Sequence, residues 1–265
     1  SASAIYTASA TGLNMNSGCL ALDKTAKKIY WIEQPSPGTK KIRRADLDGA
    51  NAEDFHTFAD QTTWYKLIGV DPAAGGKVYW YAYQKGSIYA SDKNGSNAVA
   101  LLASATSYLL SQGRPSLDLA NGRIVWMNGS AEKFYYISIA GGTTSDIVSV
   151  TTSGATQTAN NLVVNPATGK MYWVSYWGAS GNGPGDFRMA DYPSGLNAKV
   201  IDTNGGSGLT SMADYLAFDP VANRVWYFQR DASAVAHLKY AKGDGTGVTA
   251  TGLGGFNSPM VIYNE

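Results

Sequence analysis

The sequence predicts an all-β protein, a six-bladed β-propeller that occupies residues 1–265 as a single domain. Three observations support this prediction: a composition unsuited to long helices, five strand pairs that end in tryptophan, and six glycine turns that recur every 37 to 53 residues. That spacing is the period of a four-stranded propeller blade and is too long for a leucine-rich or ankyrin unit.

The composition excludes several classes of protein. Charged residues make up 15% of the chain and aromatic residues 12%, with 30 glycines, whereas long helices require far more Glu, Lys, Leu and Ala. One cysteine excludes a disulfide scaffold. Since 21 basic side chains balance 20 acidic ones, we expect no nucleic-acid partner. No apolar run is long enough for membrane insertion, so we expect a soluble, secreted or extracellular protein whose signal has been removed.

Five segments each combine a short apolar run with a second run that ends in aromatic residues. They are CLALDKTAKKIYW, IGVDPAAGGKVYW, SLDLANGRIVW, LVVNPATGKMYW and LAFDPVANRVWYF, with tryptophans at Trp31, Trp80, Trp126, Trp173 and Trp226. β-Branched and aromatic residues fit a pleated, half-buried surface, so each segment predicts two strands and a turn. The five tryptophans should therefore lie on equivalent strands.

A second hairpin is predicted after each tryptophan. Its turn glycines are Gly49, Gly95, Gly142, Gly195 and Gly245, and the same signature occurs once more at Gly12. The sequences Asp46-Leu-Asp48-Gly49 and Asp92-Lys-Asn94-Gly95 resemble the start of a calcium loop, but no glutamate follows at the twelfth position. We therefore predict type I′ hairpin turns without a metal ion.

The sixth blade is predicted to be shared between the two ends of the chain. Strands around Ile5–Tyr6 and Leu13–Met15 would be completed by a C-terminal strand at Met260–Tyr263. Closing the ring in this way would remove the unpaired strand edges of an open array.

These repeats resemble the YWTD repeats of six-bladed propellers of the low-density-lipoprotein-receptor type. The runs KIYW, KVYW, RIVW, KMYW and RVWY carry the resemblance, which covers essentially the whole chain. The chain departs from the motif after each tryptophan, where for example Ile32 and Glu33 replace threonine and aspartate. The resemblance implies the six-bladed fold and implies no ligand.

We predict a ligand-binding face where the loops between blades meet the loops inside each blade. Aromatic rings can stack on sugar C–H faces, while amides and charged groups bond to hydroxyls, so these loops favour a carbohydrate or a similar extended polar ligand. The same aromatic residues can equally serve blade packing. The candidate ligand-binding residues are Trp64, Lys66, Tyr83, Arg114, Asn161, Tyr176, Trp177, Asp214, Tyr215 and Gln229.

Motifs for catalysis are scarce in this sequence. Only two histidines are present, His56 in a predicted loop and His237 on a predicted strand, without neighbours in metal-ligand spacing. We therefore predict that no cofactor or metal ion is needed, and a non-catalytic binding module is favoured.

Two alternatives stay open. A polysaccharide-cleaving enzyme could use the same face, either as a glycoside hydrolase with Asp214 and Asp231 as its carboxylate pair or as a lyase with Lys66, Arg114 and Tyr215. A protein-binding propeller is the second alternative.

Overall fold

The computed structural model describes most of the chain, in the ranges 20–33, 39–82, 85–103, 115–128, 133–149, 157–177, 185–203, 212–230 and 235–254. The chain divides into two compact units, residues 1–105 and residues 106–265. Each unit is described by itself below, and the prediction of one domain over residues 1–265 stays a prediction.

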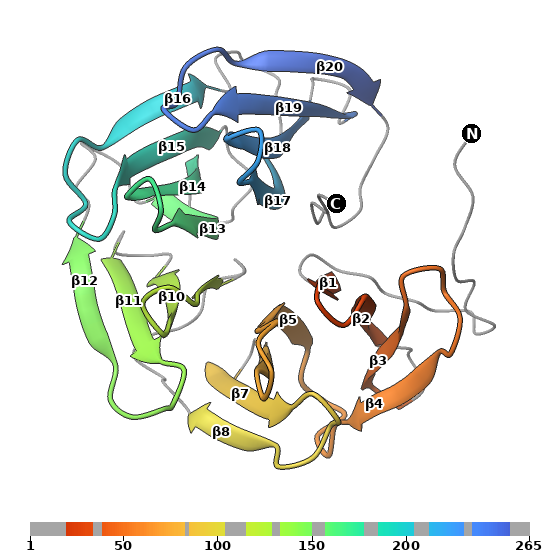
Figure 1. Cartoon of the computed structure of the whole chain (residues 1–265). Coiled ribbons are helices and arrows are strands. Elements are labelled where there is room, and N and C mark those ends of the chain that lie inside the picture. The colour runs from red at the N-terminus through yellow and green to blue at the C-terminus, as the bar shows by residue number, and fades with distance from the viewer. Residues whose placement is uncertain are drawn as a thin grey trace. The chain divides into compact units, whose positions relative to one another are not determined.

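Every sheet is a four-stranded antiparallel meander, in which each strand pairs with the strand that follows it in the chain (Figure 1). Within the described ranges, two such sheets belong to the N-terminal unit and three to the C-terminal unit. The strands of the N-terminal unit are β1 (Leu20–Asp23), β2 (Lys28–Glu33), β3 (Lys41–Asp46), β4 (Glu53–Thr57), β5 (Tyr65–Val70), β6 (Lys77–Ala82), β7 (Ser87–Asp92) and β8 (Val99–Leu102).

Twelve strands lie in the described part of the C-terminal unit and continue the same order. They are β9 (Ser116–Asp118), β10 (Arg123–Asn128), β11 (Lys133–Ser138), β12 (Ser145–Ser149), β13 (Gln157–Asn165), β14 (Lys170–Trp177), β15 (Gly185–Asp191), β16 (Lys199–Thr203), β17 (Met212–Asp219), β18 (Arg224–Arg230), β19 (Ala236–Lys242) and β20 (Thr249–Gly254).

The all-β prediction and the five repeats are confirmed, but the six-bladed closure is not supported. Five four-stranded sheets occur in the described ranges, and no helix occurs in them. The segments assigned to a sixth blade, Ile5–Tyr6, Leu13–Met15 and Met260–Tyr263, lie outside the described residues. Correspondingly, the described ranges contain no helix long and apolar enough to cross a membrane.

All five tryptophans lie on the second strand of their sheet, as predicted, but Trp226 is displaced by one residue. Trp31, Trp80, Trp126 and Trp173 are each the fourth residue of their strand, whereas the fourth residue of β18 is Tyr227. The register confirms the shift, because Leu67 pairs with Trp80 and Leu162 with Trp173, while Leu216 pairs with Tyr227. Successive residues of a strand point to opposite faces, so Trp226 lies on the other face of its sheet.

The hydrophobic cores form between consecutive sheets. In one core Tyr30 and Ile32 of β2 pack with Trp80 of β6, and in another Tyr172 of β14 packs with Tyr227 of β18. The third and fifth residues of a second strand thus face the following sheet, and the second and fourth face the preceding sheet. Both faces are buried, which explains why these strands are apolar without interruption.

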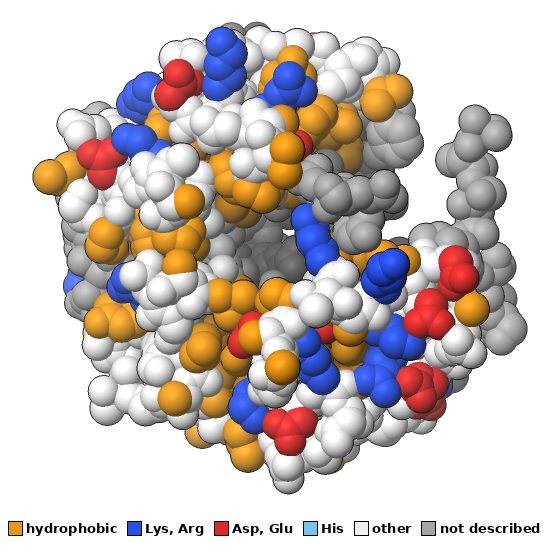
Figure 2. All heavy atoms as spheres, in the orientation of Figure 1, with side chains coloured by type: hydrophobic (Ala, Val, Ile, Leu, Met, Phe, Trp, Pro, Cys, Tyr) orange, Lys and Arg blue, Asp and Glu red, His pale blue; other side chains and the backbone are white. Residues whose placement is uncertain are grey.

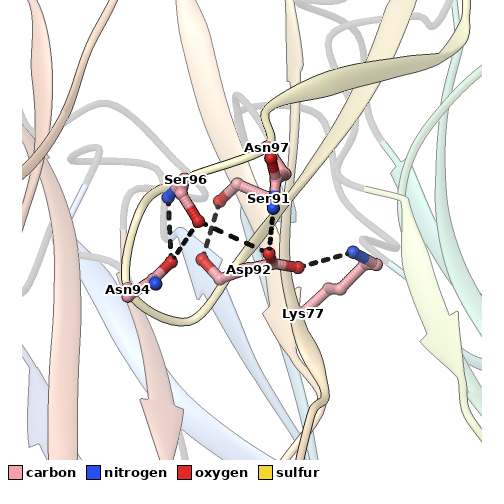
Figure 3. Close-up of polar contacts among 6 residues, drawn as sticks. All are labelled: Lys77, Ser91, Asp92, Asn94, Ser96 and Asn97. Carbon is pink, nitrogen blue, oxygen red and sulfur yellow. Dashed lines mark hydrogen bonds and ion pairs between the residues drawn. The ribbon is translucent and has the colours of Figure 1, made fainter.

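The turns between the third and fourth strands are held by a repeated polar cluster. Asp92 accepts a hydrogen bond of 2.7 Å from the side chain of Asn97 and forms an ion pair of 2.7 Å with Lys77 (Figure 3). The turns at Asp46 and Asp191 repeat the cluster: Lys28 and Asn51 contact Asp46, while Lys170 and Asn197 contact Asp191. In each of these three turns a lysine and an asparagine contact the aspartate that opens the turn.

The prediction of type I′ turns is wrong. The N–H of Gly49 donates to the carbonyl of Asp46 at 2.9 Å, which closes a four-residue turn. A type I′ turn needs positive φ at both central residues. Within this turn positive φ occurs at Gly49 (87°) and not at Leu47 or Asp48. The geometry is that of a tight turn followed by a left-handed glycine, a conformation that glycine adopts at little cost.

Buried carboxylates link one sheet to the next. Asp23, at the end of β1, is fully buried, and its Oδ2 atom lies 2.8 Å from the Nζ atom of Lys93 in the β7–β8 turn of the neighbouring sheet. In the C-terminal unit the hydroxyl of Tyr192, after β15, donates to Asp118 at the end of β9, with an O–O distance of 2.5 Å. Burial, together with the hydrogen bond to this carboxylate, raises the pKa of Tyr192. In both links, the residue directly after a third strand contacts the end of a first strand.

His56 is predicted in a loop, but it lies in β4 and is half-buried. The centre of its ring is 5.0 Å from that of Trp80 and 5.4 Å from that of Phe58. Burial lowers the pKa of His56, because the charged imidazolium would lose its hydration. The folded protein therefore favours the neutral ring.

Acidification is expected to destabilise the protein through His56. An unfolded chain takes up a proton at about pH 6.5, whereas the folded chain resists this until a lower pH, so stability is lost as the pH falls below about 6.5. The melting temperature of the wild type should fall further between about pH 7.5 and about pH 5 than that of His56→Phe, whose ring cannot titrate. Equal falls in the two proteins would contradict this role.

The sheet of β1–β4 carries charges of both signs on its outer strands. Figure 2 shows basic and acidic side chains side by side over β3 and β4. Ion pairs account for this mixture, since Lys41 Nζ lies 3.0 Å from Asp54 and Arg44 Nε lies 2.6 Å from Glu53. The basic residues Lys41, Arg43 and Arg44 are therefore paired with carboxylates of their own sheet.

Candidate functional site

One edge of the N-terminal unit gathers the chain segments on which the predicted site depends. The pairs Glu33–Lys41 and Ala82–Ser87 in the antiparallel register place the ends of β2 and β6 beside the starts of β3 and β7. The segment 58–64 joins β4 to β5 at this edge, because the N–H of Phe58 donates to the carbonyl of Lys40 at 3.1 Å. We call this region the loop edge, defined by residues 33, 40–41, 58–66, 82 and 85–87.

Trp64 is fixed at the loop edge by Lys40. The Nζ atom of Lys40 lies 4.7 Å from the centre of the indole ring and donates a hydrogen bond of 2.7 Å to the carbonyl of Thr63. Lys40 is 7% exposed, so a nearly buried ammonium contacts a partly exposed ring. A cation close to an aromatic ring is attracted by its quadrupole. Trp64 is therefore a preorganised aromatic surface.

Hydrogen bonds and stacking hold the segment that carries Trp64. Asp60 accepts from the N–H and the hydroxyl of Thr62, at 2.8 and 2.7 Å, and forms an ion pair with Lys85. The rings of Phe58 and Tyr65 stack at 3.6 Å between centroids. The bonds from Lys85 and Thr62 lower the pKa of Asp60, so its side chain is a carboxylate at neutral pH.

Lys66 is the second predicted residue that the structure describes in this unit. It lies in β5 opposite Tyr81 of β6 and is 8% exposed. Lys66 follows Trp64 by two positions, and alternate positions of an extended strand share a face. The structure thus brings Trp64 and Lys66 to the same edge. Tyr83 lies outside the described residues.

The remaining predicted residues belong to the C-terminal unit. Asn161, which is 6% exposed, has φ of 51° where the register of β13 shifts. Tyr176 and Trp177 are the last residues of β14, opposite Thr158 and Gln157. Asp214 and Tyr215 fall in the register shift of β17, and Gln229 pairs with Met212 and His237. Arg114 and Asp231 lie outside the described residues.

Ion pairs also engage Asp186 of β15 and Asp202 of β16 in the C-terminal unit. Asp186 accepts from Arg188 at 2.8 Å, and both residues are buried. Asp202 accepts from the hydroxyl of Tyr227 at 2.6 Å and from Lys239 at 3.0 Å. The second cluster joins β16 to the next sheet, and burial together with the Asp202 hydrogen bond raises the pKa of Tyr227.

The sequence interpretation missed Lys40 and Lys85 as site residues. Lys40 is absent from the predicted ligand-binding residues, although it contacts Trp64, which lies 24 positions further along the chain. Lys85 was not considered, although it forms an ion pair with Asp60. A weak signal for both residues was present in the sequence. Lys40 and Lys85 lie just before the starts of β3 and β7, which are at the same edge of the unit as the start of β5.

Three carboxylates of the predicted face, those of Glu33, Asp60 and Asp186, contact cations. Glu33 lies 3.5 Å from Arg43 and accepts from the Trp31 indole at 3.2 Å, while Asp60 and Asp186 are paired as described above. A general acid must hold a proton near neutral pH, which the lowered pKa of Asp60 prevents. Within the described ranges no group of three or more His, Cys, Asp or Glu side chains is placed to hold a metal ion.

Comparison with known proteins shows the fold. No protein-family model and no curated protein sequence matches the chain. Among solved structures, a nidogen/laminin complex matches with a TM-score of 0.64 and 15% identity, over 89% of this chain and 82% of that chain. The GH74 xyloglucanase from Xanthomonas campestris matches with a TM-score of 0.64 and 14% identity, over 90% of this chain and 39% of that chain.

A third similar structure is TolB from Acinetobacter baumannii, with a TM-score of 0.60 and 16% identity. The match covers 85% of this chain and 51% of that chain, so this chain spans about half the length of TolB. At these identities the likeness shows the β-propeller fold alone, and this fold carries both binding proteins and enzymes.

Proposed function

We propose that the protein is a secreted, non-catalytic module that binds carbohydrate through its aromatic loop residues. The observation that carries this proposal is the fixed ring of Trp64, held by Lys40 at 4.7 Å beside the anchored segment 58–64. A ring that is already immobilised loses little conformational entropy when a sugar stacks on it. Lys66, at the same edge, would bond to hydroxyl groups.

The C-terminal unit would contribute its own contacts. Tyr176, Trp177 and Tyr215 would stack on sugar rings, as would Tyr83 in the N-terminal unit, and the polar candidates Arg114, Asn161, Asp214 and Gln229 would bond to hydroxyls. Asn161 supports this assignment, because its backbone at φ of 51° interrupts the register of β13. Bulged positions often direct a side chain away from the ladder and toward a ligand.

The state of three carboxylates at the predicted face favours a binding role over cleavage. Glu33, Asp60 and Asp186 each contact a cation, and the pKa of Asp60 is lowered, whereas a hydrolase needs one carboxyl group that stays protonated. A polysaccharide-cleaving enzyme and a protein-binding propeller are the alternatives that the following experiment separates.

A glycan array followed by analysis of the products tests the proposal. We expect saturable binding without new reducing ends or unsaturated products. Trp64→Ala should weaken binding about tenfold, because a stacked ring contributes about 1–2 kcal/mol, whereas Trp64→Phe should keep most of the affinity. Both variants should melt within a few degrees of the wild type.

If cleavage products appear, the protein is an enzyme and the proposal of a non-catalytic binding module is wrong. If no glycan on the array binds, the protein-binding alternative is favoured. If Trp64→Ala binds as tightly as the wild type, the loop edge is not part of the binding site.

A further inference from the structure

The N-terminal unit contains more basic than acidic residues, and this excess of positive charge bears on Lys40 at the loop edge. Residues 1–105 contain eleven Lys and Arg but nine Asp and Glu, and all nine acidic residues are described. Seven of these carboxylates contact a basic side chain: Asp23, Glu33, Asp46, Glu53, Asp54, Asp60 and Asp92. The other two, Asp48 and Asp71, accept turn N–H groups of Ala50 and Ala73.

Lys40 differs from the ion-paired lysines of this unit. Its contacts are the Thr63 carbonyl at 2.7 Å and the Trp64 ring at 4.7 Å, and no carboxylate of the described residues lies within ion-pair distance. The neighbouring segments 34–38 and 83–84 contain no Asp or Glu in their sequence. An ammonium group has three N–H donors, and a buried one is costly unless an opposite charge compensates it.

The surroundings of Lys40 identify where a compensating charge would come from. Asp60 is the acidic residue of the segment 58–64, but it is engaged by Lys85 and Thr62. Burial lowers the pKa of Lys40, and Asp60 only partly opposes this effect. An anionic group of a ligand seated against Trp64 would supply the missing negative charge.

From these contacts we infer that the loop edge binds an acidic sugar, a hexuronate residue whose carboxylate interacts with Lys40 while its ring contacts Trp64. This inference rests on the proposed function and specifies its ligand class. A neutral sugar would satisfy Trp64 but would leave the charge of Lys40 uncompensated. The affinity should therefore depend on the carboxylate and weaken as salt screens the attraction.

Calorimetric titration with oligogalacturonate and with its fully methyl-esterified form tests the inference. The two ligands share the same backbone, and esterification removes only the negative charge. We expect the acid to bind at least tenfold more tightly than the ester, and its affinity to fall with added sodium chloride. A sulfated neutral oligosaccharide, as a third ligand, shows whether any anion suffices, in which case the assignment to a carboxylate is overturned.

Variants of Lys40 connect the effect to this residue. Lys40→Met should reduce the affinity for the acid to that for the ester, whereas Lys40→Arg should keep the preference for the acid. Lys24→Gln removes one positive charge from the exposed β1–β2 turn and should change neither affinity. Melting curves of all three variants report whether they are folded. If Lys40→Met does not fold, the result for Lys40→Arg decides the outcome.

Each result has one consequence. Equal affinities for acid and ester, with both lowered by Trp64→Ala, would overturn the acidic ligand and leave the proposed function in place. An equal loss in Lys24→Gln and Lys40→Met would show a general effect of charge and would overturn the role of Lys40. Absence of binding to the acid, the ester and every neutral glycan would overturn both proposals.

Discussion

Lys93→Met is expected to lower the free energy of unfolding by about 3–5 kcal/mol, because it leaves a fully buried carboxylate without its cation. Asp23 is 0% exposed, and its Oδ2 atom accepts no hydrogen bond from the described residues. Among the described residues, the positive charge in contact with this oxygen is Lys93 Nζ, at 2.8 Å. Loss of the ammonium group therefore removes the compensation without removing the buried charge.

The same sheet supplies a matched control. Lys77 and Asp92 form a pair of similar length, 2.7 Å, but their side chains are 37% and 36% exposed. Exposed pairs contribute about 0–1 kcal/mol, so Lys77→Met should have a small effect. Chemical denaturation of both variants measures the difference. Similar losses in the two would contradict the importance of burial.

A double variant separates the buried charge from the contact itself. In Asp23→Asn/Lys93→Met the amide oxygen can still accept from the N–H of Ala26, which the Oδ1 atom of Asp23 accepts at 3.0 Å in the wild type. Since no charge is then buried, most of the lost stability should return. If the double variant is as unstable as Lys93→Met, the lost stability comes from the ion-pair contact between the two sheets and not from a buried, unpaired carboxylate.

The sequence predicted the local features of the fold because they are encoded in short repeats. Alternating apolar runs and turn glycines defined the sheets, and the run KVYW placed Trp80 on a second strand. The contacts between sheets could not be predicted in this way. Asp23 and Lys93 are 70 positions apart, and nothing in either repeat indicates that their side chains meet.

The candidate site was predicted in part for the same reason. Trp64 and Lys66 were found because they lie directly before and within a predicted first strand. Lys40 was missed as a site residue, since its contact with Trp64 requires the segment 58–64 to return to the start of β3. Turn chemistry was also mistaken in detail: glycine at Gly49 fits several hairpin types, and the observed one needs a single left-handed residue.

Tyr227→Ala is expected to destabilise the protein by about 3–5 kcal/mol, which is the usual cost of truncating a buried aromatic ring. Tyr227 is 0% exposed and packs with Tyr172 and Phe187 of the preceding sheet. Its hydroxyl also donates to Asp202 at 2.6 Å. The variant therefore loses both apolar packing and a hydrogen bond to a carboxylate.

Trp226→Ala provides the comparison that tests the displaced register. A tryptophan removes more apolar surface than a tyrosine when both are buried equally, and the repeat pattern alone would make Trp226 the core residue. In the structure Trp226 is partly exposed and contacts Tyr240 at 4.9 Å between ring centroids. Its truncation should cost about 1–2 kcal/mol, since a contact near the surface loses less burial.

The order of these two effects distinguishes the two registers. If Tyr227 occupies the position of Trp31, Trp80, Trp126 and Trp173, as the pairing of Leu216 with Tyr227 indicates, Tyr227→Ala must be the more damaging change. Tyr227→Phe should recover most of the loss, because the ring restores packing while only the bond to Asp202 is missing. A larger loss for Trp226→Ala in urea titrations would instead place the tryptophan in the core between the sheets and would shift the register of β18 by one residue.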